Sequence, residues 1–260
     1  MEINGFIILP LVFARVTGLV LVAPIYGGSA VPLQVRGLLA AGLTLLIAPS
    51  QWDGSVPTFD GLPGYLVLLG VDALVGACLG LGLLVLLHGM TLAGELIGRL
   101  SGLGLAEAFD PNLDENVPQL SRLLFLLAAC VFLCIGGHRA VMAGLLETFR
   151  AIPPGSGVLP RPLCDSLMTL VSQSFSLGVR AAAPVLASLL VATLTMGLVG
   201  RTLPQLNFLS LGFGVNAMLA FAALALSLGA VAWAFQGQVE PALETLLDAL
   251  KVPLRTQWLT

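Results

Sequence analysis

Charged residues are scarce in this sequence. Only 10% of its 260 residues are charged, 57% are hydrophobic and the mean hydropathy is +1.00, whereas a soluble domain carries about 25% charged residues. The formal net charge is −3 and no basic block occurs, so neither nucleic acid nor an anionic membrane surface is indicated as a partner. The scarcity of charge excludes an ordinary soluble protein and predicts an integral membrane protein.

Motifs for catalysis are also missing. The two histidines, His88 and His138, lie far apart in the sequence, and there is no H-E-x-x-H, no Gly-rich phosphate loop and no pair of carboxylates within one membrane segment. The Gly-Ser-Gly at 155–157 stands among prolines with no histidine near it, which favours a flexible loop over a nucleophile loop. We therefore expect neither an enzyme nor a cofactor.

Cysteine usage gives no sign of a disulfide framework or a metal site. The sequence has four cysteines, Cys78, Cys130, Cys134 and Cys164, without a C-x-x-C spacing. The first three lie in apolar helical runs. In such runs a thiol behaves as a small hydrophobic group. We interpret these cysteines as packing residues.

What the sequence has in abundance is long apolar runs. They predict helices over 3–24, 37–49, 62–90, 120–135, 165–200 and 208–236. Several reach the roughly 20 residues that cross a hydrocarbon core, and runs of this length indicate helices, not barrel strands. The predicted fold is an all-α, multi-helix integral membrane protein, in which the first segment is a retained helix and not a signal peptide.

A few ionisable residues interrupt these runs. They are costly inside a membrane and suggest function: Arg15, Asp72, Glu95, Arg99 and Arg180. A small-molecule transporter would use such groups at the bilayer midplane, with broken helices in two matching halves. The sequence has broken helices but no matching halves. Pairing of these charges with one another or with a neighbouring subunit is an equally good interpretation.

Glycines recur at four-residue spacing on two predicted helical stretches. Gly76 and Gly80 form one such pair, and Gly94, Gly98 and Gly102 form a second series. Small residues at this spacing make a smooth helix face that another backbone can approach closely. We favour packing between helices of this chain over packing against another subunit.

The last residues differ from the rest. In 237–260, Leu243, Leu246, Leu247 and Leu250 fall on one helical face, with charged residues opposite. We predict a helical membrane domain over 1–236 and an amphipathic tail over 237–260.

The most polar segment is 106–119, AEAFDPNLDENVPQ, which holds four acidic residues and two prolines. Such a segment cannot face hydrocarbon, because its backbone groups and charges would be unsatisfied there. An ordinary surface loop is the favoured interpretation from the residues alone, and a re-entrant loop lining a pore is the second.

Several of these stretches, taken in order, resemble one family. FARVTGLVLVAPIYGGSAVPLQVRGLLAAGLTLLIAP (13–49), AEAFDPNLDENVPQL (106–120), GGHRAVMAGLLETFRAIPPG (136–155) and GLVGRTLPQLNFLSLGFG (197–214) are similar to the FliR family of flagellar biosynthesis proteins and its type III secretion counterparts of the SctT type. The most specific element comprises Arg201, Pro204, Gln205, Asn207, Gly212 and Phe213. Gly214 stands where the family usually has proline.

The resemblance implies a non-enzymatic subunit of a protein-export gate in the bacterial inner membrane, within the flagellar basal body or injectisome. It implies a hetero-oligomeric assembly of helical hairpins with FliP-like and FliQ-like membrane subunits and an FlhB-like subunit. Unfolded exported polypeptides would pass through the conduit of this assembly. Membrane lipid would contact the assembly from outside.

The resemblance also gives the acidic segment a role. The family's loop between the third and fourth hydrophobic segments plugs the resting conduit, and it maps here onto 105–119. The implied plug residues are Glu107, Phe109, Asp110, Pro111, Asp114 and Glu115. Gly102 and Gly104, directly before the loop, would serve as hinges because glycine adopts backbone dihedrals that other residues avoid.

Overall fold

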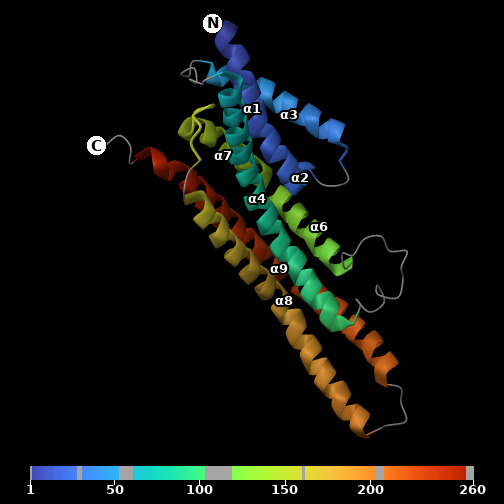
Figure 1. Cartoon of the computed structure of the whole chain (residues 1–260). Coiled ribbons are helices and arrows are strands. Elements are labelled where there is room, and N and C mark those ends of the chain that lie inside the picture. The colour runs from blue at the N-terminus through green and yellow to red at the C-terminus, as the bar shows by residue number, and fades with distance from the viewer. Residues whose placement is uncertain are drawn as a thin grey trace. The chain divides into compact units, whose positions relative to one another are not determined.

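A computed structural model describes residues 2–27, 31–52, 61–102, 119–159, 162–202 and 208–255 of the chain. Within these ranges the protein is helical and contains no strand (Figure 1). The helices are α1 (Glu2–Val22), α2 (Pro24–Gly27), α3 (Leu33–Ile47), the 3-10 helix η1 (Ala48–Gln51), α4 (Gly61–Ser101), α6 (Gln119–Cys134), α7 (Gly137–Ala151), α8 (Pro162–Thr202) and α9 (Phe208–Arg255).

The helices confirm the predicted all-α membrane class. Five described stretches are long and apolar enough to cross a membrane: Gly5–Val22, Leu33–Gln51, Gly61–Ser101, Pro162–Arg201 and Gly214–Asp248. Helices α6 and α7, which are separated by a short break, would make a sixth if they form one broken span. Gly136 occupies this break with φ +78°, a conformation that glycine adopts at no steric cost.

The helix boundaries differ from the predicted ones in three places. Helix α4 continues eleven residues beyond 90, α9 continues from 236 to Arg255, and α7 lies where no helix was expected. Hydropathy marks where a helix is apolar, whereas α7 contains Arg139, Glu147 and Arg150 and therefore lacks the apolar pattern of a crossing. The division of the chain at residue 236 stays a prediction, since α9 passes that residue without a break.

The chain forms two compact units. Unit 1 comprises residues 1–86, 136–171 and 239–260, and unit 2 comprises 87–135 and 172–238. The long helices α4, α8 and α9 each contribute residues to both units.

Helix α1 is the centre of unit 1. One stripe of its side chains, spaced three and four residues apart, is almost fully buried: Ile8, Leu11, Val12, Arg15, Val16, Leu19 and Val20. It packs against α3 and η1, and Figure 1 shows α3 running beside it. The stripe is apolar except for Arg15, so α1 brings a charge into the core of this unit.

Unit 2 is held together by small residues. At Gly94 of α4 the backbone of α6 lies so close that an added Cβ would overlap Ser121. At Gly89 a Cβ would come within 2.6 Å of the Ser174 carbonyl oxygen on α8, and at Gly178 of α8 it would come within 2.6 Å of the Gly89 carbonyl oxygen. Close backbone contacts of this kind are how helices associate without a hydrophobic driving force.

Candidate functional site

The buried charge in unit 1 is an ion pair between α1 and α4. The Arg15 guanidinium donates hydrogen bonds to Oδ1 of Asp72, from Nε at 2.9 Å and from Nη2. Both side chains are buried. Removing two charges from water is costly, and it is tolerated only when the remaining donors and acceptors are also satisfied.

The C-terminal end of α7 supplies those additional partners. Arg15 Nη1 donates to the carbonyl oxygens of Thr148, at 3.1 Å, and Ile152, at 2.9 Å. The Thr148 carbonyl belongs to the last turn of α7 and also accepts from the N–H of Ile152, the residue that caps the helix. Carbonyl groups at this end of a helix carry its negative dipole end. The guanidinium also lies 4.5 Å above the ring centroid of Phe149, a favourable cation–π geometry.

The other oxygen of the carboxylate is held by the loop after α7. The backbone N–H of Gly155 donates to Asp72 Oδ2 at 2.9 Å. Gly155 has φ +76°, so this turn requires the conformation that glycine provides. The Gly-Ser-Gly segment predicted to be flexible is therefore fixed at its first residue. Arg15 and Asp72 thus join α1, α4, the end of α7 and the following loop.

Glycines bring α1 and α4 together next to this pair. A Cβ at Gly76 would overlap the carbonyl oxygen of Arg15, and one at Gly80 would come within 2.9 Å of Val22 Cβ. A Cβ at Gly18 on α1 would overlap the Ala73 carbonyl oxygen. The predicted glycine face of this helix therefore meets another helix of the same chain, and the close approach sets the position of Arg15 opposite Asp72.

A second contact of unit 1 lies beyond the membrane-length part of α1. The Tyr26 hydroxyl donates to the His138 carbonyl oxygen at 3.2 Å, and burial raises the pKa of Tyr26 above its ordinary value.

His138 and His88 belong to different units, and the described residues contain no cluster of three or more His, Cys, Asp or Glu that could hold a metal ion.

The predicted plug lies outside the described residues, together with Gly104, Pro204, Gln205 and Asn207. Gly102 follows the last residue of α4 with φ +79°, the usual conformation of a glycine that ends a helix. Gly98 is buried in α4, and Ser101 donates to its carbonyl oxygen.

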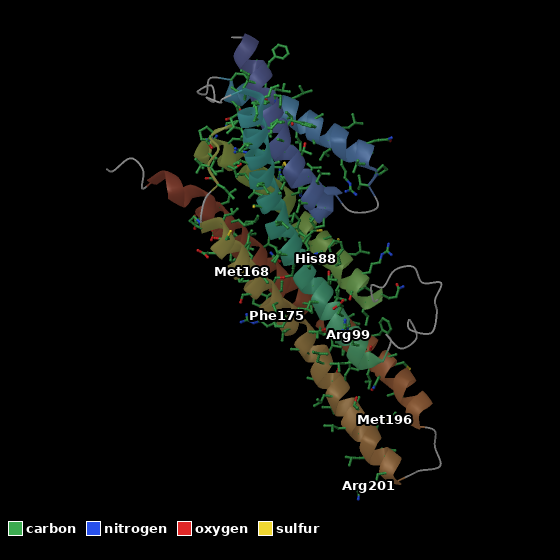
Figure 2. All side chains as sticks on the ribbon, viewed as in Figure 1. His88, Arg99, Met168, Phe175, Met196 and Arg201 are labelled. Atoms are coloured by element: carbon green, nitrogen blue, oxygen red, sulfur yellow. The ribbon has the colours of Figure 1, made fainter. Side chains whose placement is uncertain are left out.

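The remaining family-motif residues lie at the end of α8 and in α9. Arg201 is exposed at the end of α8, where Figure 2 shows it with Met196 one to two turns before it. Gly212 is half-buried in α9, which also contains Phe213. The helix begins at Phe208 and continues through Gly214, so the residue at the usual proline position does not interrupt it.

Sequence reasoning singled out Arg15 and Asp72 but missed their four other partners. Opposite charges in two separate apolar runs were the available signal for the pair. Nothing in the sequence pattern marked Thr148, Phe149, Ile152 or Gly155, because three of them contribute backbone groups and Phe149 a ring face.

Comparisons with known proteins place the chain in a family. The model for bacterial export proteins, family 1, matches residues 6–242. The flagellar biosynthetic protein FliR of Escherichia coli K12 is 34% identical over 199 residues, 76% of each chain. FliR of Caulobacter vibrioides is 30% identical over 85% of this chain and 88% of its own, and FliR of Bacillus subtilis is 25% identical over 92% and 93%. The chain belongs to the FliR family of bacterial export proteins.

Proposed function

We propose that this chain is a structural subunit of a type III protein-export gate in the bacterial inner membrane. It assembles with FliP-like and FliQ-like membrane subunits, with an FlhB-like subunit at the base, around a conduit for unfolded polypeptides. The observation that carries this proposal is the family match over residues 6–242. The chain works without catalysis of its own, and the energy for export comes from elsewhere in the machine.

The exposed apolar surface of α8 and α9 supports an assembly role. Large apolar side chains are exposed along both helices, among them Leu190, Leu194, Leu198, Met218, Phe221 and Leu226. Figure 2 shows Phe175, also exposed, on the same α8 as Met196 and Arg201. Apolar surface of this extent marks contact with lipid or with another protein, as a subunit of a membrane assembly requires.

The enclosed state of the Arg15–Asp72 pair argues against a transporter site at this position. A transporter's intramembrane charges face a water-filled cavity where substrate or ions bind. Arg15 is 0% exposed and its partners all come from this chain. Such a pair is suited to fixing the fold of unit 1, not to binding a solute.

The connection between α4 and α6 is the proposed plug. It spans 17 residues, 102–118, whereas helix connections in bundles usually have 2–8. Both flanking helices are held together nearby, because Gly94 packs directly on Leu120 and Ser121. A long acidic segment between two anchored helix ends can occupy a passage at rest and be displaced by a polypeptide driven through it.

Removing the plug tests this role. Deletion of 106–116 leaves six residues between Ser101 and Gln119, enough to span roughly 20 Å. The distance to be closed is about 10 Å, estimated from the seven residues of α4 beyond the Gly94 contact. We expect the deleted complex to assemble normally and to leak ions or small solutes when expressed in cells.

A matched control separates loss of the plug from strain on the helices. Replacing 106–116 by eleven Gly and Ser residues keeps the length and removes the four acids, Phe109 and Pro111. This variant should also leak, though it places no strain on α4 or α6. Unchanged permeability of both variants in an assembled complex would refute the plug role while leaving the subunit role intact.

A further inference from the structure

A pocket of about 740 Å³ lies between α8 and α9 within unit 2. Helix α8 lines it with residues four apart, Ser172, Ser176 and Arg180, and α9 with Trp233, Gly237 and Gln238. The lining therefore combines one guanidinium, hydroxyl and amide groups, and an aromatic ring. Such a mixture differs from the apolar surface along the rest of these helices.

Two polar groups of the pocket lack a partner. No carboxylate of the described residues lies within ion-pair distance of Arg180, which is exposed. The side-chain oxygen Oε1 of Gln173, also in the lining, is buried and has no hydrogen-bond partner among the described residues. Buried polar atoms are nearly always paired, so the pocket suits a ligand that carries both an anion and a hydrogen-bond donor.

A glycine, Gly237, forms part of the pocket wall. A Cβ at Gly237 would meet nothing within 4 Å. The glycine is therefore not required for helix packing, unlike Gly89 or Gly178, although glycine inside a helix costs roughly 1 kcal/mol relative to alanine. Its absent side chain leaves room at the wall of the pocket.

The sequence places this pocket at the end of a membrane-length apolar stretch. Residues 181–200 of α8 carry no charge and are bounded by Arg180 and Arg201. Twenty helical residues measure about 30 Å, the thickness of a hydrocarbon core. On α9 the uncharged stretch from Phe208 continues past Trp233, and tryptophan favours the membrane–water interface. Both helices therefore put the pocket at the level of lipid headgroups.

From these features we infer that the pocket binds the phosphate-ester headgroup of a phospholipid. Arg180 pairs with the phosphate, since guanidinium groups form charge-assisted hydrogen bonds with phosphate oxygens. A headgroup hydroxyl or ammonium donates to Gln173 Oε1, and Trp233 covers the glycerol region. The pocket lies within unit 2 alone, and its ligand does not depend on the export role of the chain.

Native mass spectrometry of the full chain in detergent micelles tests this site. The probes are dioleoylphosphatidylglycerol, dioleoylglycerol, which has the same acyl chains without the phosphate, and water-soluble glycerol 3-phosphate. We expect a phosphatidylglycerol adduct that is weakened roughly tenfold in Arg180→Gln, the size expected for loss of one charged hydrogen bond. Gly237→Leu should lose the adduct because it fills the pocket.

Matched variants control for general effects on charge and packing. Arg122→Gln removes an exposed arginine of α6 in the same unit, and Gly229→Leu places the same side chain on α9 where a Cβ also meets nothing within 4 Å. Both should bind the lipid like the wild-type chain. Circular dichroism checks that each variant remains helical.

The outcomes separate the possible ligands. Adducts that are unchanged in both Arg180→Gln and Gly237→Leu, or equal adducts with dioleoylglycerol, would overturn the site. Binding of glycerol 3-phosphate alone, with the same dependence on Arg180, would retain a phosphate site but overturn the lipid as its source.

Discussion

Helix α1 and the 181–200 stretch of α8 have similar apolar composition but opposite surroundings. In α1 the chain's own helices cover a continuous stripe and even a buried arginine, while along α8 successive large side chains such as Leu190, Leu194 and Leu198 remain exposed. Apolar composition alone therefore does not say what covers a helix. The first region supplies its own environment, and the second requires lipid or other subunits.

The charged side chains of the two units also differ in whether the chain itself covers them. In unit 1 a charge pair with four further contacts is enclosed by the chain, so its main effect is to fix one arrangement of α1, α4 and α7. In unit 2, Arg180 is exposed beside a pocket. A family of export proteins would need both properties, namely a fixed scaffold and a surface available for assembly.

Breaking the buried pair should have the largest effect on stability. Arg15→Met leaves Asp72 buried without a counter-charge, which costs about 3–5 kcal/mol. The free energy of unfolding of the detergent-solubilised chain should fall accordingly in denaturant titrations. Arg99→Gln, which removes the exposed partner of Glu95 at 3.8 Å, should change it by less than about 0.5 kcal/mol.

A double variant sharpens this result. Arg15→Met with Asp72→Leu removes both charges, and apolar replacement of a buried pair is often close to neutral. It should recover a substantial part of the stability lost in Arg15→Met. Equal losses in the single and double variants would show that the surrounding packing, not the unpaired charge, determines the cost.

Two adjacent leucines on α8 compare the covered and uncovered faces directly. Leu189 is 2% exposed and Leu190 is 63% exposed. Leu189→Ala should lower the free energy of unfolding by about 2–5 kcal/mol, the cost of a core truncation, and Leu190→Ala by less than about 0.5 kcal/mol. Thermal unfolding of the isolated chain measures both, and similar losses would mean that Leu190 is covered within the chain.

Glycines of α4 should show a smaller effect, with opposite signs at two positions. Gly76→Ala forces a Cβ into the Arg15 carbonyl oxygen and should destabilise the chain by about 1–3 kcal/mol. At Gly70 on the same helix a Cβ meets nothing within 4 Å, so Gly70→Ala should stabilise it by up to about 1 kcal/mol. A destabilising Gly70→Ala would contradict the distinction between contact glycines and free ones.

The sequence predicted much of the fold because long apolar runs have few alternatives to a membrane helix. It predicted the existence of α1, α3, α4, α6, α8 and α9 and an amphipathic helix in the tail. It did not predict the extension of α4 beyond Met90, nor that the tail helix continues α9 without a break. A helix continues as long as its backbone bonds and tertiary packing support it, even where its apolar run has ended. The missed helix α7 shows the same limit, since its short, charged sequence is stabilised by packing.

The candidate site was predicted less completely. Arg15 and Asp72 stood out because charges in apolar runs are rare, and Gly76 and Gly80 because their spacing matches a helix face. The partners of the ion pair from α7 and its loop did not, since backbone carbonyls and N–H groups leave no residue-specific signal. The segment 105–119 lies outside the described residues, so its role as a plug stays a prediction.

Co-expression with FliP-like and FliQ-like partners, followed by native mass measurement, tests the export-gate account most directly. The account predicts that this chain leaves the membrane in a complex with both partners and accumulates poorly without them, because its α8 and α9 faces are then uncovered. A chain that purifies as a stable monomer, binds a small solute and ignores both partners would contradict it.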